Sequence, residues 1–332
     1  MENKLKAYKV SILVPVYGVE KYIEKCVRSL MTQTYKNIEY VFVNDCTKDK
    51  SIEIIESVIN EYPDRKNSVI IVNHEQNSGL GAARNTAIKN ATGEFIMHVD
   101  SDDFIRKECV QKCVEAQQSV DADVVSFGKN EIYVDYSREL LPPKTSDKEE
   151  MLCAVISRKC SVAIWGRLIR KSLYTNNDLK VDPRYNIGED YQITPLLFYY
   201  AKRIVNIQEV YYEYNRTNVN SYIWSYSEKV QKEDFESQKI VYNFFCDKGQ
   251  QYVDAFQKCR QRTIIRSMKS TLLENKDRQY FYELRESLLK IDRSYREDTD
   301  FFERAFFYIS NFDILRMYLK LSMFVKHKVL NK

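Results

Sequence analysis

The chain has 332 residues, of which 44% are hydrophobic and 30% are charged, a composition typical of a globular protein with a substantial apolar core. Its formal net charge of +4 is too small to indicate a nucleic-acid partner. No stretch approaches the roughly 18 apolar residues of a membrane span, and the N-terminus leads into no secretory apolar segment, so we expect a cytoplasmic protein. The eight cysteines include no C-x-x-C pair, which favours isolated buried thiols over a zinc site.

Strand-like and helix-like segments alternate from residue 10 to about residue 126. Short β-branched runs predict strands at 10–14, 40–43, 69–72, 95–99 and 123–127. Apolar residues at helical spacing predict helices at 22–31, 52–59, 82–91 and 110–120. Such alternation predicts an α/β fold with a Rossmann-like, mostly parallel central sheet, right-handed crossovers and helices on both faces.

The rest of the chain is less regular. Residues 141–150 are polar and turn-rich, as in a surface loop, and 210–214 alternate like a last strand. From about residue 225 there is no proline and aromatic residues recur with charges at helical spacing, which predicts a C-terminal helical appendage. We therefore expect a catalytic domain over 1–224 and a helical region over 225–332.

Three carboxylates, Asp100, Asp102 and Asp103, directly follow the fourth expected strand. Ligands of open α/β sheets bind beyond the carboxyl ends of the strands, so these acids lie where a site is expected. Asp100 and Asp102 can serve one hard divalent cation, which takes oxygen ligands and often shares them with a substrate's phosphates. The alternative is that Asp102 or Asp103 caps a helix beginning near Phe104. One carboxylate is enough for a cap, so three favour metal and phosphate.

Polar residues also follow the other strands, at 15–17, at Asp45 and at 77–84, and in a doubly wound sheet these ends converge on one crevice. An acid there can bind a ribose or a base edge, and an arginine at a helix start can meet phosphate. The glycines at 79 and 81 do not form a dinucleotide-binding fingerprint, because Arg84 replaces the third glycine and the segment follows the third strand.

Together these residues resemble the signature set of glycosyltransferase family 2. The matching motifs are Val14-Pro15-Val16-Tyr17, Val43-Asn44-Asp45, Asn77-Ser78-Gly79 through Ala83-Arg84-Asn85, Val99-Asp100-Ser101-Asp102-Asp103 and Gly188-Glu189-Asp190. They follow the family's order over residues 8 to about 221. The resemblance implies the GT-A fold, with a nucleotide-sugar half at about 8–127 and an acceptor half at about 128–224. It also implies inverting transfer from a nucleotide sugar, with UDP as the expected nucleotide, in bacterial surface polysaccharide synthesis on a glycan or lipid-linked acceptor.

The resemblance assigns roles on the donor side. Pro15, Tyr17 and Asp45 would hold the uracil and ribose, and Arg84 would support the nucleotide. The chain departs from the family at Cys46-Thr47-Lys48, where Gly-Ser-Thr is usual, so the sugar preference does not carry over.

The resemblance also assigns the diphosphate side. Asp100 and Asp102 would form the D-x-D motif, with Asp102 the direct ligand of a divalent metal, Mg²⁺ or Mn²⁺. Arg216 and Ser221 fit the basic and polar pair that such enzymes bring over the diphosphate.

On the acceptor side, Asp190 would be the general base that takes the proton of the acceptor hydroxyl. Glu189 either orients Asp190, raises its pKa by like-charge proximity, or faces solvent. Trp165 resembles the tryptophan of the family's W-x-K-L stretch, where acceptor stacking competes with core packing.

Two other functions compete with this prediction. A nucleotidyltransferase also binds phosphates through strand-end acids and metal, but it would usually carry a glycine-rich basic loop after the first strand, which 15–20 is not. A catalytically inactive nucleotide-sugar-binding scaffold would not need Asp100, Asp102 and Asp190 intact.

The C-terminal segment 301–332 carries six basic and two acidic residues among many apolar ones. A helix of this kind can lie in the headgroup layer of an anionic membrane, which would place the protein peripherally on the inner face of the plasma membrane. Packing on the catalytic domain or on a second subunit is the alternative, and no pattern predicts the oligomeric state.

Overall fold

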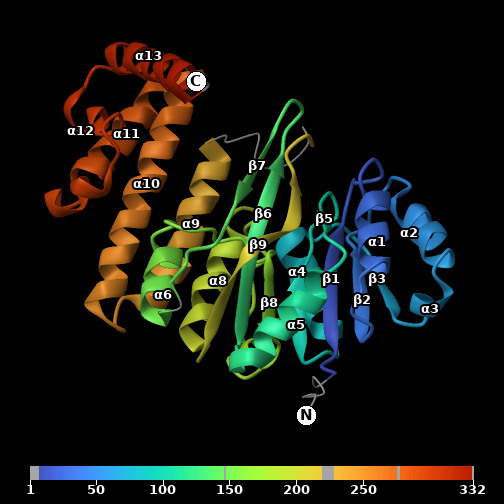
Figure 1. The fold of residues 1–332 in the computed structure, drawn as a ribbon. Coiled ribbons are helices and arrows are strands. Elements are labelled where there is room, and N and C mark those ends of the chain that lie inside the picture. Colours follow the sequence, from blue (N-terminus) through green and yellow to red (C-terminus); the bar gives the residue numbers. More distant parts are fainter. Residues whose placement is uncertain (1–6, 146, 219–227, 275–276, 331–332) are drawn as a thin grey trace.

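The computed structural model describes residues 7–330 except 146, 219–227 and 275–276, and the expectations for Ser221 lie outside this range. Its described strands form one nine-stranded sheet in the order β3-β2-β1-β4-β8-β6-β9-β5, with β7 paired to β6 (Figure 1). The strands are β1 (Val10–Val16), β2 (Ile38–Asn44), β3 (Val69–Asn73), β4 (Phe95–His98), β5 (Phe104–Ile105), β6 (Val124–Ile132), β7 (Ser137–Leu140), β8 (Arg167–Arg170) and β9 (Ile204–Asn215).

The first four strands in the sheet order are parallel, as are β6 and β9, whereas β8 runs antiparallel to both β4 and β6. The mostly parallel sheet is therefore confirmed. The helices of this part of the chain are α1 (Ile23–Met31), α2 (Ser51–Asn60), α3 (Pro63–Lys66), α4 (Leu80–Asn90), α5 (Cys109–Val120), α6 (Lys148–Ile156), α7 (Ser172–Thr175) and α8 (Glu189–Tyr200).

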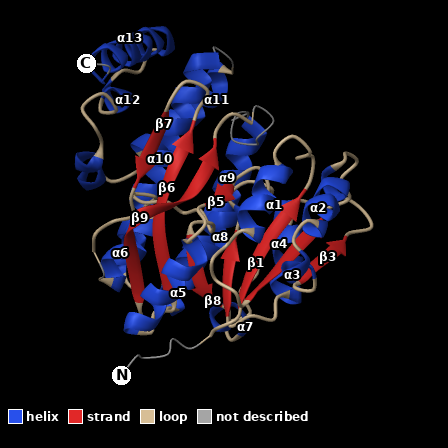
Figure 2. Ribbon diagram, turned by 45° about the vertical axis from the view of Figure 1, so that its right-hand side comes forward, coloured by secondary structure: helices blue, strands red, loops and turns tan. Residues whose placement is uncertain are grey.

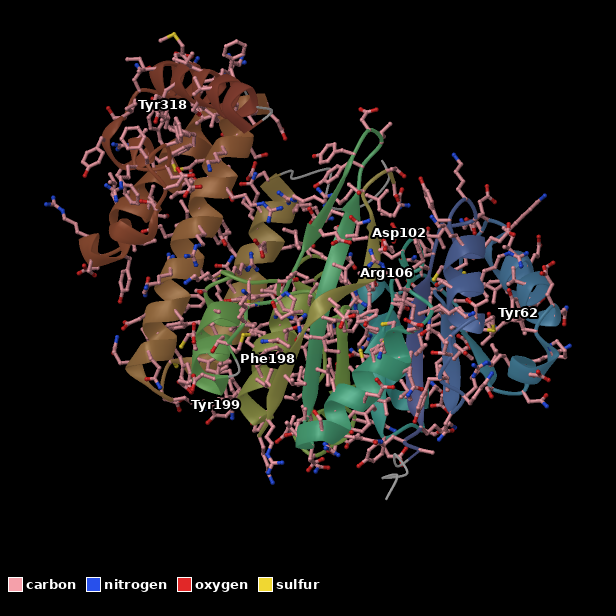
Figure 3. All side chains as sticks on the ribbon, viewed as in Figure 1. Tyr62, Asp102, Arg106, Phe198, Tyr199 and Tyr318 are labelled. Carbon is pink, nitrogen blue, oxygen red and sulfur yellow. The ribbon has the colours of Figure 1, made fainter. Side chains whose placement is uncertain are left out.

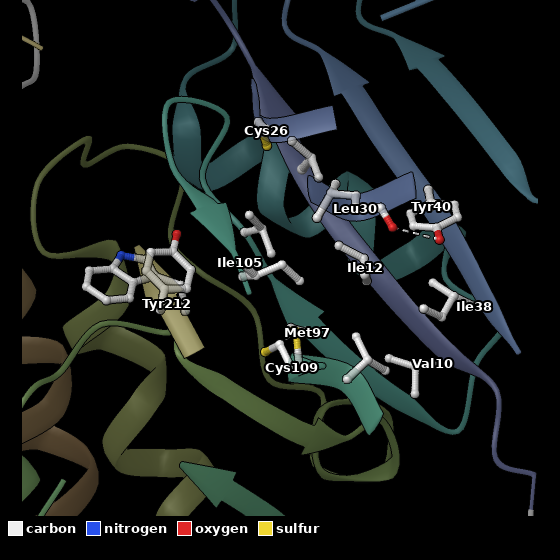
Figure 4. Close-up of a cluster of buried hydrophobic side chains, with 14 of the residues drawn as sticks. Val10, Ile12, Cys26, Leu30, Ile38, Tyr40, Met97, Ile105, Cys109 and Tyr212 are labelled. Atoms are coloured by element: carbon white, nitrogen blue, oxygen red, sulfur yellow. Dashed lines mark hydrogen bonds between the residues drawn. The ribbon is translucent and has the colours of Figure 1, made fainter. Parts of the chain in front are cut away.

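Helices cover both faces of the sheet (Figure 2) because the central strands bury alternate side chains on opposite sides. In β1, Ile12 and Val14 belong to a core shared with α1, α2 and α5, whereas Leu13 belongs to a second core shared with α4, α6 and α8. Figure 4 shows part of the first core, in which the hydroxyl of Tyr40 donates to the carbonyl oxygen of Leu30 at 3.1 Å.

The structure adds three short strands, β5, β7 and β8, that the sequence did not predict. It also rejects the helix-cap interpretation of the carboxylate run. Residues 104–105 form β5, paired with β9, and the next helix, α5, begins only at Cys109. Asp102 and Asp103 therefore cap no helix.

The predicted helical region is confirmed. It contains α9 (Glu228–Phe245), α10 (Gln250–Glu274), α11 (Arg278–Leu289), a 3₁₀ turn (Arg293–Asp298), α12 (Ala305–Tyr308) and α13 (Phe312–Leu330). Parts of α9 and α10 pack into the second core beside α6 and α8, and α11 to α13 build a third core with the rest of α10. None of the helices in the described part of the chain is long and apolar enough to cross a membrane.

Candidate active site

The turn between β4 and β5 carries the three carboxylates, and the structure gives them different surroundings. Asp103 is 1% exposed and both its oxygens are occupied: the Tyr212 hydroxyl donates at 2.8 Å and the Asn215 backbone N–H at 2.7 Å. Burial raises the pKa of Asp103, and the nearby charges of Asp102 and Asp100 raise it further. Asp103 therefore ties the turn to β9, which leaves Asp100 and Asp102 for a ligand.

Asp102 and Arg216 lie at the same end of the sheet, on the turn and just after β9 (Figure 3 labels Asp102). One oxygen of Asp102 accepts a hydrogen bond from the Asn218 side-chain amide at 2.8 Å. Burial, together with the charge of Asp100, raises the pKa of Asp102. Arg216 donates to the Tyr214 hydroxyl at 3.1 Å. Of the predicted pair over the diphosphate, Arg216 and Ser221, only Arg216 lies within the described residues.

Arg84, on α4, is the centre of the site. Its side chain is 1% exposed, and its Nη2 lies 3.1 Å from Asp100, 3.4 Å from Asp190 and 3.6 Å from Glu189. We expected Arg84 to support the nucleotide, and in the structure the carboxylates of Asp100, Glu189 and Asp190 surround its guanidinium below the surface. One buried cation therefore holds together acids that lie 90 residues apart in the sequence.

Glu189 and Asp190 begin α8, whose N-cap Gly188 has a φ of 80°. A side chain at Gly188 would also meet Ser237 of α9, since an added Cβ would lie 2.8 Å from the serine Cβ. Burial and the charge of Asp190 raise the pKa of Glu189. Burial also raises the pKa of Asp190, against the opposing effect of Arg84. Glu189 is 8% exposed, which excludes only the last of its three alternatives, that it faces solvent.

Asp45, expected at the base and ribose, is 3% exposed at the end of β2. Its carboxylate accepts hydrogen bonds from the backbone N–H groups of Ser78 and Gly79, both at 2.8 Å. His74 contacts it at 2.7 Å through Nδ1 and reaches Thr86 of α4 at 2.8 Å through Nε2. Asp45 therefore shapes the loop before α4, and His74, which directly follows β3, fixes that carboxylate.

Pro15 and Tyr17 lie at the end of β1, next to the end of β2. Pro15 pairs with Val43 in the sheet and is buried, whereas Tyr17 is 48% exposed and available to a ligand. The two loops are tied together by the Gly18 N–H, which donates to the Thr47 hydroxyl at 2.9 Å. These positions are compatible with the predicted nucleotide site.

Trp165 packs in the core. It is 8% exposed, its ring stacks on Tyr212 at 4.4 Å with an interplanar angle of 15°, and Tyr214 lies at 4.9 Å. Of the two alternatives, packing is therefore the one supported, because little of the ring is left for an acceptor sugar. Tyr212 was missed by sequence reasoning, although the alternation of 210–214 put Tyr212 and Tyr214 on one face.

The residues present fit a divalent cation whose remaining ligands come from the substrate. Oδ1 of Asp100 is buried, and although it lies 3.1 Å from Nη2 of Arg84 it makes no hydrogen bond within the described structure. Within that same part of the chain, no three His, Cys, Asp or Glu side chains form a complete cation site. A cation at Asp100 and Asp102 would hence need oxygen atoms from a diphosphate, as hard cations in such sites commonly do.

Comparison with known proteins gives the family. Residues 11–161 match the model of glycosyl transferase family 2. An uncharacterized glycosyltransferase of Bacillus subtilis, EpsJ, is 32% identical over 249 residues, which cover 71% of this chain and 70% of EpsJ. Among solved structures, residues 1–349 of TarS from S. aureus in complex with UDP-GlcNAc align with a TM-score of 0.60 at 20% identity, covering 88% of this chain and 93% of that one. A mannosyltransferase from Pyrobaculum calidifontis, in complex with GDP-Man and Mn²⁺, aligns with a TM-score of 0.53 at 14% identity, covering 96% and 86%.

The fold and the strand-end motifs thus agree with the sequence relatives. This chain belongs to glycosyltransferase family 2 and is a nucleotide-sugar glycosyltransferase with the GT-A fold.

Proposed function

We propose that this enzyme transfers a sugar from a UDP-sugar to a hydroxyl of a glycan or lipid-linked saccharide, with inversion at the anomeric carbon. The observation that carries the proposal is the contact of Arg84 with both Asp100 and Asp190. Asp100 of the D-x-D motif and the candidate base Asp190 therefore lie close together, next to the same guanidinium. Transfer from a diphosphate donor to an acceptor hydroxyl requires that the residues for the two substrates be close in this way.

On the donor side, Pro15, Tyr17 and Asp45 bind the nucleoside, and Arg216 faces the diphosphate. Asp102 and Asp100 hold Mg²⁺ or Mn²⁺, which when bound stabilises the negative charge that develops on the leaving nucleoside diphosphate. The mannosyltransferase structure with GDP-Man and Mn²⁺ supports a divalent metal, and the TarS complex with UDP-GlcNAc supports UDP as the nucleotide.

On the acceptor side, Asp190 accepts the proton of the attacking hydroxyl. The pKa of a sugar hydroxyl is far above 7, so a carboxylate must take the proton as the new bond forms. Burial raises the pKa of Asp190, which makes it a better base than an exposed aspartate. Glu189, beside it on the acceptor side, lies 3.6 Å from the Arg84 guanidinium and helps to hold it in place. Attack from the side of Asp190, opposite the departing diphosphate, gives inversion without a covalent intermediate.

The proposed catalytic domain is 1–224, with its donor half at about 8–127 and its acceptor half at about 128–224, and the proposed helical region is 225–332. A relative named for a polymer, the poly(ribitol-phosphate) β-N-acetylglucosaminyltransferase of Staphylococcus aureus, supports an acceptor that is part of a polymer.

The helical region also suggests where the enzyme works. In α13, Phe312, Leu315 and Leu319 pack into the third core. The opposite face leaves Met317 69% and Leu321 61% exposed. We propose that this outer face, at the far end of the helical region (Figure 1), lies on an anionic membrane surface.

One assay tests the transferase proposal. The enzyme is incubated with Mg²⁺ or Mn²⁺ and a panel of nucleotide sugars, and the released nucleotide is identified by mass. Release of UDP from a UDP-sugar supports the proposal. Release of pyrophosphate would indicate a nucleotidyltransferase instead, and donor binding without turnover would indicate a scaffold.

A sedimentation assay with phosphatidylglycerol and phosphatidylcholine vesicles tests the membrane proposal. Because residues of 301–332 build the third core, point variants are better than truncation. We expect Leu321→Glu to abolish salt-sensitive binding to the anionic vesicles, while Leu141→Glu, at a residue 53% exposed elsewhere, leaves it intact. Equal binding of all forms, or a dimer that Leu321→Glu dissociates in light scattering, would assign this face to another role.

A further inference from the structure

The hairpin formed by β6 and β7 projects beyond the sheet (Figure 1) and carries two tyrosines at its tip. The rings of Tyr133 and Tyr136 stack with their centroids 4.5 Å apart and an interplanar angle of 12°. The Tyr133 N–H donates to the Tyr136 carbonyl oxygen at 2.9 Å across the two-residue turn, so the backbone fixes the pair. Even so, Tyr136 is 61% exposed. The hairpin thus presents a rigid aromatic surface to solvent.

This surface begins at the candidate active site. Ile132, the last residue of β6, pairs with Asn215 of β9 and accepts a hydrogen bond from the Arg216 N–H at 2.8 Å. Asn215 in turn donates to Asp103 on the carboxylate turn at 2.7 Å. The Arg216 guanidinium also lies 5.8 Å from the centre of the Tyr133 ring. The stacked tyrosines therefore start one residue beyond the strand pair that adjoins the carboxylates.

We propose that Tyr133 and Tyr136 form a subsite for an oligosaccharide, namely the part of the acceptor beyond the sugar that is glycosylated. This inference rests on the proposed function, since it assumes that the acceptor is a saccharide. An exposed aromatic face packs against the apolar C–H face of a sugar ring, and tyrosine offers this area with little side-chain entropy to lose. Asp135, at the turn, supplies carboxylate oxygens that can accept hydrogen bonds from sugar hydroxyls beside the ring.

The surroundings favour a saccharide over other occupants. Asp135, Arg138 and Glu139 are exposed along the same hairpin, and these charges oppose insertion of the tip into a bilayer. A stack that only stabilised the hairpin would gain most from burying both rings, because cross-strand pairs act through packing. Instead Tyr136 is left 61% exposed.

Binding of cellotetraose and of chitotetraose, followed by saturation-transfer NMR and by titration, tests the subsite. We expect one of the two to bind wild-type protein, Tyr136→Ala to weaken that binding about tenfold, and Tyr136→Phe to retain it. Val134→Ala is the matched control, because Val134 is 83% exposed on the same turn and has no ring. Thermal unfolding of each variant shows whether the hairpin remains folded.

Three outcomes would overturn the inference: no binding of either tetrasaccharide to the wild type, equal binding by Tyr136→Ala, or equal weakening by Val134→Ala. Release of UDP from the donor in the absence of acceptor is measured on the same variants and should be unchanged. If the wild type releases no UDP from any donor while tetrasaccharide binding still depends on Tyr136, the proposed transferase activity fails and the saccharide subsite stands.

Discussion

Replacement of Arg84 by methionine removes the cation around which the site is built. Methionine fills a similar volume but leaves Asp100, Asp190 and Glu189 facing one another without a counter-charge. At the 3.1 Å separation of Arg84 and Asp100, one such pair is worth about 5 kcal/mol with an effective dielectric constant of 20. Desolvation of the arginine offsets much of this, and the usual net cost of breaking a buried ion pair is about 3–5 kcal/mol.

The same substitution should change catalysis in a defined way. Without Arg84, the opposing effect on the pKa of Asp190 is lost, so that pKa should rise further and the base should be protonated at a higher pH. The acidic limb of the kcat profile should therefore move toward higher pH, and turnover at neutral pH should fall. Urea unfolding and donor turnover from pH 5 to pH 9 measure the two effects separately.

Arg158 provides the matched control. Its side chain is 17% exposed, and it makes a paired contact with Asp234 of α9 at 2.6 and 2.9 Å. Arg158→Met should also cost stability, because it removes the arginine paired with the buried Asp234, but it should leave the pH profile in place. A loss below about 1 kcal/mol for Arg84→Met, or an unshifted acidic limb, would refute the assigned role of Arg84.

Four further outcomes are expected. Asp102→Asn should abolish metal-dependent turnover with little change in urea stability, and normal activity of this variant in chelator would contradict the metal assignment. Asp190→Asn should lose transfer but keep its affinity for UDP in calorimetry, since the base acts on the acceptor; an equal loss of UDP affinity would move Asp190 to the donor site. Because Cys46 has a φ of 59°, Cys46→Gly should raise the free energy of unfolding in urea by about 0.5–1 kcal/mol. An unchanged unfolding midpoint would argue against backbone strain at this residue. Burial raises the pKa of Glu39, but hydrogen bonds from Lys9, Ser11 and Thr92 outweigh this effect and lower the pKa to about 2. The charged carboxylate should therefore stabilise the fold fully above pH 5, and this contribution should be lost as the pH falls toward 2. In urea unfolding at different pH values, Glu39→Gln should remove this dependence.

Much of the fold was predictable because its central strands are continuous apolar runs and its helices carry a clear amphipathic period. The three unpredicted strands lack these signals. β5 has two residues, β7 reads Ser-Arg-Glu-Leu, and β8 begins and ends with arginine, so their pairing depends on neighbours far away in the chain.

The site was predictable in its membership but not in its internal arrangement. The motifs identified Asp100, Asp102 and Asp190 as candidates, yet nothing in a motif says which side chain is buried. The resemblance assigned Arg84 to support of the nucleotide, and its place near a helix start suggested contact with phosphate. In the fold its helix packs against β1 and β2, which turns the guanidinium inward toward α8. Burial is a property of tertiary packing, which is why this role became visible only in the structure.

The contacts of β9 suggest how the donor and acceptor sides are kept in register. Tyr212 of β9 donates to Asp103 and also accepts from the Asp100 backbone N–H at 3.1 Å, while its ring stacks on Trp165. Three residues further on, the Asn215 N–H donates to the same aspartate, and Asn215 pairs with Ile132, which directly precedes Tyr133 in the β6–β7 hairpin. A shift of β9 would therefore move the carboxylate turn and the hairpin together. The run of three carboxylates is best understood in this way: Asp100 and Asp102 are the two that we propose for the substrate, and Asp103 fixes the strand β9 to the turn that carries them.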